Sequence, residues 1–247
     1  MNILSFFAHP DDETMLAGGA LALLAMLGHS VHYLVCTRGD GGEVGEPPVC
    51  DQAQLGKFRT VETINAVKAL GGKTIDFLDY IDPIVGPDNL LFTFSDDIDK
   101  IVTQLTRVVR KHNIDSIISH GSNGEYGHPA HKTVYQAVKL YFEENKNSRL
   151  AWYTAQANYP NSVKPHLINV DDPASWVLDI KPVINQKINA AKAHVSQNAL
   201  FVRRRQKELN RSVPLEEVIA NEEAYGWVRG SRDELLSIFD ASKNIKR

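Results

Sequence analysis

The chain has 247 residues with an apolar fraction of 43% and a charged fraction of 23%, a composition typical of a folded globular protein and not of a disordered one. Its formal net charge of -3 gives no electrostatic reason to expect a nucleic-acid partner, because domains that bind nucleic acid usually carry a basic face. Its longest apolar stretch, Met15 to Leu27, is shorter than the roughly 20 residues that a membrane span needs, so we expect one cytoplasmic domain over residues 1–247 with no membrane span.

The first residues have the pattern of a βαβ unit. Asn2 to Ala8 is a short apolar run without helical period, which indicates a buried strand. A helix capped by Thr14 is predicted to follow and to end at Leu27, and Ser30 to Thr37 is predicted to be a second strand. Strand, helix and strand at this spacing favour parallel strands joined by a right-handed crossover.

Strands and helices continue to alternate along the chain. The glycine- and proline-rich segment Arg38 to Pro48 is predicted to be a loop, and Gln52 to Leu70 a helix. The apolar period of that helix comes from Leu55, Phe58, Val61, Ile64, Val67 and Leu70. The later predicted elements are strand Thr74–Leu78, helix Ser95–His112, strand Ser116–Ser119, helix Lys132–Phe142, strand Leu150–Thr154, strand Trp176–Ile180 and helix Pro182–Val195. This order predicts an α/β protein with a Rossmann-like three-layer fold and a mostly parallel central sheet.

Two further groups of residues have structural interpretations. Trp152 and Trp176 are expected to pack in the core of the sheet, although tryptophans can also stack on sugar rings. The cluster Arg203 to Arg205 is followed by Glu208, so we expect it to lie on a solvated helix face.

The active site is expected outside the carboxyl ends of the strands, where open parallel sheets bind ligands. Three loops reach that edge: the one at His9, the one over Arg38 to Pro48, and the one over His120 to His131. Polar residues in these loops are therefore candidates for one shared site.

Two of these loops contain clusters of histidines and carboxylates. The segment AHPDDE, residues 8–13, places one imidazole and three carboxylates where the first strand ends. Acidic residues are also favoured near helix N-termini, so this cluster alone does not require a metal. However, His128 and His131 lie three residues apart at a loop-to-helix junction and reach the same edge of the sheet. Together the two clusters favour a metal site.

The best ligand set is His9, Asp12 and His131, because three protein ligands with one position left for water is the arrangement of a catalytic zinc. Asp11 is then free to remove a proton from water, and His128 can stabilise a developing oxyanion and protonate a leaving amine. Two histidines and one carboxylate also form the facial triad of non-haem iron oxygenases, which the residues alone leave open.

The motif AHPDDE after the first strand, together with HPAH at residues 128–131, resembles the PIG-L/LmbE family of zinc-dependent N-deacetylases. That family includes the N-acetylglucosaminyl-phosphatidylinositol, mycothiol, bacillithiol and chitobiose deacetylases. The matches that span most of the chain are Thr37–Glu43, Arg59-x-x-Glu62 with Ala66, Leu70-Gly71, Phe77–Asp79, and His194-x-Ser196-Gln197.

The resemblance implies roles for the residues of the site. Zinc is expected on His9, Asp12 and His131, with Asp11 as the general base. His128 is expected to be a charged group that faces the oxyanion, Tyr126 to be a mobile residue that polarises the carbonyl, and Arg59 to bind polar groups of the substrate. Ala130 departs from the family, in which many members have an acid at this position, so the resemblance leaves the pKa of His128 and the pH optimum open.

The function that the resemblance implies is hydrolysis of an N-acetyl group from a small-molecule amino sugar or its conjugate. An amidase that acts on a larger conjugate is an alternative, because variable loops form the pocket walls. A non-catalytic nucleotide- or sugar-binding module is another, although GDGGEVG at residues 39–45 does not fit GxGxxG and the chain contains no GxxxxGK[ST]. The sequence leaves open the exact substrate, the acyl group and whether the protein is a homo-oligomer.

Overall fold

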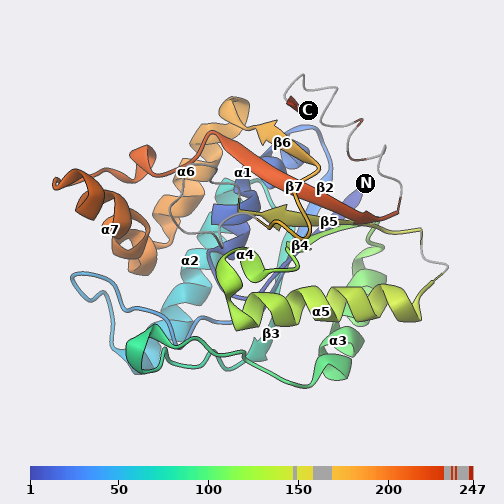
Figure 1. Ribbon diagram of the computed structural model, residues 1–247, viewed down its shortest axis with the longest axis horizontal. Helices are drawn as coiled ribbons and strands as arrows, with labels where there is room; N and C mark the ends of the chain where they lie inside the picture. The colour runs from blue at the N-terminus through green and yellow to red at the C-terminus, as the bar shows by residue number, and fades with distance from the viewer. Residues whose placement is uncertain (147–148, 158–168, 231–234, 236, 238–244, 247) are drawn as a thin grey trace.

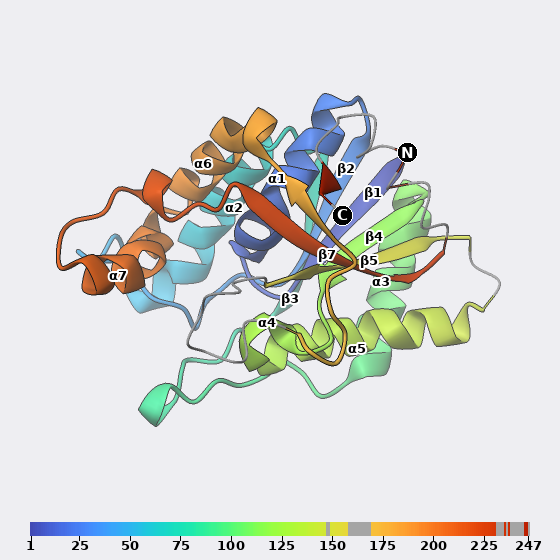
Figure 2. The same cartoon turned by 45° about the horizontal axis from the view of Figure 1, so that its top comes forward.

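A computed structural model describes residues 1–146, 149–157, 169–230, 235, 237 and 245–246. A central sheet of eight strands runs through the protein in the order β3-β2-β1-β4-β5-β7-β6-β8, with helices on both faces (Figures 1 and 2). The three-layer α/β fold predicted from the alternation of strands and helices is confirmed. Strands β3, β2, β1, β4 and β5 are parallel, and the remaining pairings are antiparallel.

The strands are β1 (Asn2–Phe7), β2 (Ser30–Thr37), β3 (Thr74–Tyr80), β4 (Ser116–His120), β5 (Ala151–Gln156), β6 (Trp176–Asp179), β7 (Glu222–Arg229) and β8 (Ile245–Lys246). The α-helices are α1 (Asp12–Met26), α2 (Leu55–Ala69), α3 (Ile98–His112), α4 (Gly124–Gly127), α5 (Pro129–Glu144), α6 (Ile184–Ala193) and α7 (Asn198–Leu209). Among the described residues, no helix combines the length and the apolar character needed to cross a membrane.

The position of β1 in the sheet determines where loops can meet. The chain goes from β1 outward to β2 and β3 on one side, and then returns to place β4 and β5 on the other side. β1 therefore pairs with both β2 and β4, and the loops that follow β1 and β4 leave the sheet at the same edge. This change of direction is the place where open α/β sheets form a binding crevice.

Alternating side chains of the strands supply two hydrophobic layers. In β1, Ile3 and Phe7 contribute to one cluster of buried residues, whereas Leu4 and Phe6 contribute to the other. This alternation follows from the two-residue period of a strand that is buried on both faces. The first cluster lies under α1, α2 and α6, and the second lies under α3 and α5.

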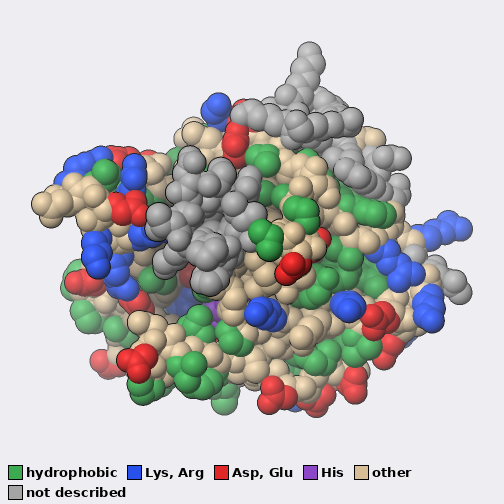
Figure 3. Space-filling model, in the orientation of Figure 1, with side chains coloured by type: hydrophobic (Ala, Val, Ile, Leu, Met, Phe, Trp, Pro, Cys, Tyr) green, Lys and Arg blue, Asp and Glu red, His purple; other side chains and the backbone are tan. Residues whose placement is uncertain are grey.

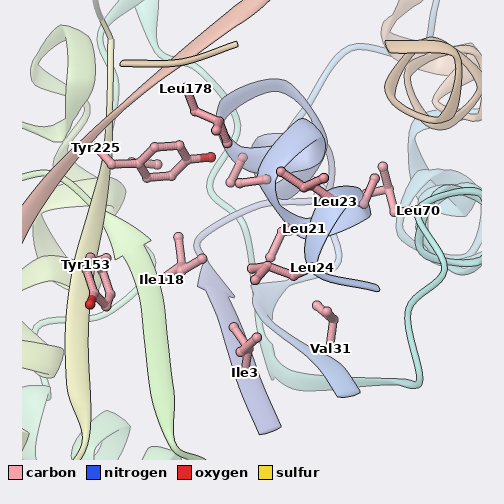
Figure 4. Close-up of a cluster of buried hydrophobic side chains, with 14 of the residues drawn as sticks. Ile3, Leu21, Leu23, Leu24, Val31, Leu70, Ile118, Tyr153, Leu178 and Tyr225 are labelled. Carbon is pink, nitrogen blue, oxygen red and sulfur yellow. The ribbon is translucent and has the colours of Figure 1, made fainter. Parts of the chain in front are cut away.

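The first cluster is shown in Figure 4, where Leu21 and Leu24 of α1 lie above β1 and β2. Trp176 belongs to this cluster and Trp152 to the other, and they are 3% and 2% exposed. The prediction that both tryptophans pack in the core is therefore confirmed.

Helix α2 differs in part from its predicted buried face, of which Leu55, Val67 and Leu70 are buried as expected. Val61 and Ile64, which belong to the predicted apolar period, are 57% and 46% exposed. The buried face instead includes Arg59 and Glu62, which are 3% and 4% exposed. The apolar period therefore gave only part of the buried face, because Arg59 and Glu62 have buried partners in distant loops, which a pattern of apolar residues cannot reveal.

Element boundaries and the C-terminal elements also differ from the expectation. Helix α1 begins at Asp12, two residues before the predicted cap Thr14, and α5 begins at Pro129, three residues before Lys132. Helix α7 and strands β7 and β8 were not predicted, because the alternation of strands and helices weakens after residue 154. The arginine cluster does lie on a helix, α7, but only two of its members pair with Glu208.

A buried ion pair anchors helix α1 to the second half of the chain. Nζ of Lys187 lies 2.6 Å from Oε1 of Glu223, and both side chains are 2% exposed. Lys187 also donates to the carbonyl of Met15, while the amides of Gly19 and Ala20 donate to Glu223. The ion pair therefore bonds to three backbone groups of α1 and ties this helix to α6 and β7.

The substitution Glu223→Gln should therefore destabilise the protein strongly. It leaves the Lys187 ammonium buried without its counter-charge, which we expect to lower the free energy of unfolding by about 3 kcal/mol in urea titrations. Lys192→Gln is the matched control, because Lys192 and Glu216 form an exposed pair whose loss should cost less than about 1 kcal/mol. Equal losses in the two variants would contradict the structural role of the buried pair.

Candidate metal centre

The first loop of the site follows β1 and turns sharply at Asp11. The backbone of Asp11 has φ 94°, a left-handed conformation that costs a non-glycine residue about 1–3 kcal/mol. The turn separates two successive aspartates, so that Asp12 reaches the histidines while Asp11 contacts Arg59. The amide of His9 donates to Oδ2 of Asp12 at 2.9 Å, which closes the loop against the start of α1.

The second loop lies between β4 and α5 and contains the short helix α4. Two glycines in this loop have positive φ, a conformation that glycine adopts without strain, and they help the chain to reverse. Helix α5 then begins at Pro129, a residue that suits the first turn because it needs no N–H partner. Nδ1 of His128 accepts from the amide of Ala130 at 3.2 Å and caps the helix. This start places His131 in the first turn of α5, next to the loop after β1.

Asp12 lies between two of the predicted metal ligands. Its Oδ2 is 3.2 Å from Nδ1 of His9, and its Oδ1 is 3.3 Å from Nε2 of His131. All three residues are buried. Burial alone would raise the pKa of Asp12, but the neighbouring histidines hold it well below its usual range. The structure therefore brings together one ionised carboxylate and two imidazoles.

One buried nitrogen of this group is left without a hydrogen bond. Among the described residues, Nε2 of His131 has no hydrogen-bond partner, although an unpaired buried polar atom costs free energy. His131 is also the residue shared by two groups whose ligand atoms lie within 4.8 Å of one another, namely His9, His128 and His131, and Asp12, His120 and His131. A metal ion would use the free lone pair, so the side chains present fit such an ion.

His120 is less suited to bind a metal than its position suggests. The amide of Ala8 donates to Nε2 of His120 at 3.0 Å, so this nitrogen has no free lone pair. Nδ1 then carries the proton and donates to Oε2 of Glu125 at 2.9 Å. The ring of His120 is therefore held in place between the backbone and a carboxylate.

Glu125 bridges the two buried histidines. The oxygen that accepts from His120 also lies 2.6 Å from Nδ1 of His131, and the other carboxylate oxygen accepts from the amide of Gly121. Burial would raise the pKa of Glu125, but the two histidines lower it to about 2. The bridge directs Nε2 of His131 toward Asp12, an arrangement that is typical of histidines that bind metals.

Sequence reasoning missed Glu125 and His120 as parts of the site. Glu125 is 1% exposed and has φ 57°, which places a second strained residue in this centre. The available signal was one acidic residue in a loop between two histidines. Its spacing alone does not distinguish a buried carboxylate from a solvated one.

Asp11 is held by the residue that was predicted to bind substrate. Oδ2 of Asp11 accepts from Nη2 of Arg59 at 3.0 Å, and Arg59 also donates to the carbonyls of Pro10 and Gly39. Arg59 is 3% exposed, so these protein groups use much of its donor capacity, and a contact with substrate stays a prediction. Burial raises the pKa of Asp11 to about 7, although Arg59 lowers it.

His128 and Tyr126 lie beside the His/Asp group, which consists of His9, Asp12 and His131. The ring of His128 stacks on that of His131 with centroids 4.4 Å apart, and the ring of Tyr126 meets His128 edge-on at 5.7 Å. Because Nδ1 of His128 accepts a backbone amide, its proton lies on Nε2, and burial lowers the pKa of His128 to about 2. The resemblance implied a charged group here, whereas this environment favours the neutral ring.

Asp82 adds a second carboxylate beside His9. Its Oδ1 lies 3.3 Å from Nε2 of His9, and Asp82 comes from the segment between β3 and α3. Burial would lower the pKa of His9, but Asp12 and Asp82 raise it to about 9. The centre therefore favours positive charge, whether on a proton or on a cation.

A cavity of about 710 Å³ opens from this centre. His9, Asp11, Asp12 and His128 line one part of it. Other parts are lined by apolar side chains of the segment 81–94 and by Glu43 and Arg203, which form an ion pair. Figure 3 shows mixed basic and acidic side chains gathered over α7, and a small histidine surface lower on the same face.

The glycine-rich loop after β2 packs closely against protein groups. A side chain at Gly39 or Gly42 would collide with the guanidinium of Arg59, and one at Gly41 would collide with the backbone of Pro83. Close packing therefore explains these glycines, and the loop gives no support to a phosphate-binding module.

The chain matches a family model and curated proteins over much of its length. Residues 4–142, more than half of the chain, match the family model for GlcNAc-PI de-N-acetylase, PIG-L. The chain is 27% identical to a 1D-myo-inositol 2-acetamido-2-deoxy-alpha-D-glucopyranoside deacetylase of Rhodococcus jostii, with 94% of this chain and 93% of that protein covered. It is 30% identical to the deacetylase of the same description from Rhodococcus erythropolis, with 79% and 80% covered.

Solved structures share the fold at low sequence identity. The N,N'-diacetylchitobiose deacetylase of Pyrococcus horikoshii superposes with a TM-score of 0.63 at 20% identity, over 92% of this chain and 83% of that one. The zinc-inhibited form of the teicoplanin deacetylase Orf2 gives 0.64 at 16% identity, over 94% and 100%. GalB, a 4-carboxy-2-hydroxymuconate hydratase of Pseudomonas putida, gives 0.62 at 19% identity, over 92% and 96%.

The bridge formed by Glu125 leads to a prediction about metal affinity. Glu125→Gln should weaken metal binding by about 10- to 100-fold, because the amide no longer accepts strongly from both histidines. Titration of the metal-free protein with Zn²⁺ against a competing chelator measures this affinity. Glu143→Gln on the exposed side of α5 is the control and should bind as the unaltered protein does. Equal affinities in all three proteins would show that Glu125 does not orient a ligand.

Proposed function

Because the chain belongs to the PIG-L family of GlcNAc-PI de-N-acetylases, we propose that it is a metal-dependent hydrolase that removes an N-acetyl group from an amino sugar or an amino-sugar conjugate. The observation that carries the proposal is the position of Asp11. Its carboxylate is separated from the His/Asp group by one sharp turn, lines the same cavity, and has a pKa of about 7. A base with a pKa near neutrality suits hydrolysis of an amide.

The proposed ligands of the metal are His9, Asp12 and His131, and the proposed metal is zinc. Two imidazoles and one carboxylate leave a position for water, which is the arrangement of catalytic zinc sites. When bound, the metal would lower the pKa of a water molecule and polarise the amide carbonyl. Two histidines and one carboxylate also bind iron in facial-triad oxygenases, so iron is the alternative metal. The identity of the metal that the purified protein retains distinguishes the two.

Asp11 is the proposed general base. Its carboxylate faces the cavity and is held by Arg59, so it can accept a proton from the attacking water without changing its position. The same proton is then available to the nitrogen of the departing amine. One residue thus supplies both proton transfers, and the overall reaction consumes one water and gives acetate and an amine.

His128 is proposed to donate a hydrogen bond to the developing oxyanion. Its neutral ring carries the proton on Nε2, because Nδ1 accepts the amide of Ala130. Loss of the Nε2 proton would leave an anionic ring, so we assign protonation of the amine to Asp11 and not to His128. Tyr126 is 49% exposed beside His128 and is the proposed second donor to the carbonyl oxygen.

The cavity supports a conjugate as the substrate. Its volume of about 710 Å³ is within the range of about 300–1,000 Å³ that is usual for sites of small organic ligands. The relatives from Rhodococcus act, by their descriptions, on an inositol glycoside of the N-acetyl sugar. The apolar wall formed by Ile84 and Phe92 keeps an amidase acting on a larger conjugate as the second candidate.

The first experiment measures metal content and acetate release together. We expect about one zinc per chain, and acetate from at least one of N-acetylglucosamine, its inositol glycoside and diacetylchitobiose. The assay is repeated across zinc concentrations, because the structurally similar teicoplanin deacetylase Orf2 has a zinc-inhibited form. Zinc without acetate release from any substrate would overturn the deacetylase proposal, and iron would overturn the proposed chemistry.

Asp11→Asn tests the general base. The amide cannot accept a proton, so kcat should fall by about 10²- to 10⁴-fold while the metal content stays near that of the unaltered protein. Asp12→Asn is the matched comparison, because the same change on the neighbouring residue should remove the metal itself. Retention of most of the activity by Asp11→Asn would show that another group acts as the base.

A further inference from the structure

A buried turn late in the chain contacts three segments around the proposed active site. Residues Val195–Gln197 form a short 3-10 turn between α6 and α7, and His194 immediately precedes it. His194, Ser196 and Gln197 are 0%, 1% and 2% exposed, although all three have polar side chains. Such burial costs free energy unless the polar groups form hydrogen bonds. Each of these three side chains has a hydrogen-bond partner near the site.

His194 reaches the start of α1. Its Nε2 lies 3.2 Å from Oε1 of Glu13 and 3.3 Å from Oγ1 of Thr14. Oε2 of Glu13 in turn accepts from the backbone amide of Asp11 at 3.1 Å. Glu13 is fully buried, so this pair of contacts connects residue 194 to the backbone of the proposed base.

Ser196 reaches the same base by a second route. Its amide and its hydroxyl donate to the two carboxylate oxygens of Glu62, each at 2.7 Å. Glu62 lies one turn after Arg59 on α2, and Arg59 donates to the carboxylate of Asp11. The turn therefore holds the backbone of Asp11 through Glu13, and its carboxylate through α2.

Gln197 reaches a third segment. Its Nε2 donates to the carbonyl of Glu43 at 2.8 Å, within the glycine-rich loop that lines the cavity. The loop after β1, the loop after β2 and helix α2 are thus joined to one turn that lies more than 120 residues later in the chain.

We propose that the turn over residues 194–197 is a positioning element that holds the Asp11 carboxylate in its reactive place, with His194 as its central residue. This role rests on the deacetylase function proposed above. The left-handed backbone of Asp11 is unfavourable for an aspartate, so neighbouring groups must maintain it. The hydrogen bond from its amide to Glu13 fixes its backbone, and the hydrogen bond from Arg59 fixes its carboxylate. Without the bond to Glu13, the loop relaxes and the carboxylate turns away from the substrate.

The central test is the kinetics of His194→Phe. Phenylalanine keeps the ring and removes the hydrogen bond to Glu13, and a misplacement of about 1 Å can cost about 10²-fold in rate. We expect kcat to fall by about 10- to 100-fold, with KM and zinc content within about twofold of the unaltered enzyme. His194→Gln restores an N–H donor for Glu13 and should recover much of the lost kcat.

A matched control separates positioning from general destabilisation. His32 is also buried and bonds to Thr74, but it lies near the amino end of β2, away from the site. His32→Phe should lower thermal stability without a comparable loss of kcat. A loss of kcat equal to that of His194→Phe would mean that both effects are structural, which would overturn the positioning role.

A double variant tests whether His194 acts through Asp11. In the Asp11→Asn background, His194→Phe should have little further effect on the residual rate, because the group that it positions is already lost. Additive losses would overturn the proposal. If His194→Phe does not fold, Ser196→Ala carries the same test, because it removes the hydroxyl that donates to Glu62 and accepts from Gln197 but keeps the amide bond to Glu62.

The outcomes separate this proposal from the function on which it rests. An unaltered enzyme that releases acetate, together with fully active His194→Phe, overturns the positioning role and leaves the deacetylase function intact. An unaltered enzyme that releases acetate from none of the substrates overturns the function, and the positioning role falls with it.

Discussion

The site depends on a single constraint, which is that two successive aspartates must face different partners. An ordinary turn into α1 would not separate the side chains of Asp11 and Asp12 in this way. The left-handed backbone at Asp11 directs Asp12 to the buried histidines and Asp11 to Arg59. Strain of this kind persists only where the surroundings over-determine it. Many of the buried polar side chains around the site maintain this backbone conformation.

The supporting groups are polar side chains that are buried in positions where a globular protein usually places apolar ones. Arg59 and Glu62 occupy the inner face of α2, and Glu125 is enclosed between two histidines. Each has a partner of opposite or complementary character, so its burial does not leave an unpaired charge. Helix α2 therefore buries less apolar surface, because Val61 and Ile64 face solvent. In return, its buried polar side chains hold the residues at the carboxyl ends of the strands in fixed positions.

The fold alone does not determine the reaction. Deacetylases and a hydratase superpose on this chain with nearly equal TM-scores, so the same layers carry different chemistry. Hydrolysis is supported instead by the family to which the chain belongs and by the residues of the site. These are an ionised carboxylate between two imidazoles, a second carboxylate with a pKa near neutrality, and a neutral histidine that can donate from Nε2.

The sequence by itself determined the order of the elements through α6, apart from the short helix α4, and the loops that form the site, because strand and helix periods are local properties. It also predicted that His9, Asp12 and His131 lie close together, since parallel strands end at one edge of the sheet. Tertiary structure alone decided the burial of Arg59 and Glu62 on α2, the bridge by Glu125, the hydrogen bond that Nδ1 of His128 accepts and the contacts of His194. These features depend on partners that are distant along the chain or on the hydrogen bond that one ring nitrogen makes. A local pattern contains no information about such partners, so they could be identified only once the chain was folded.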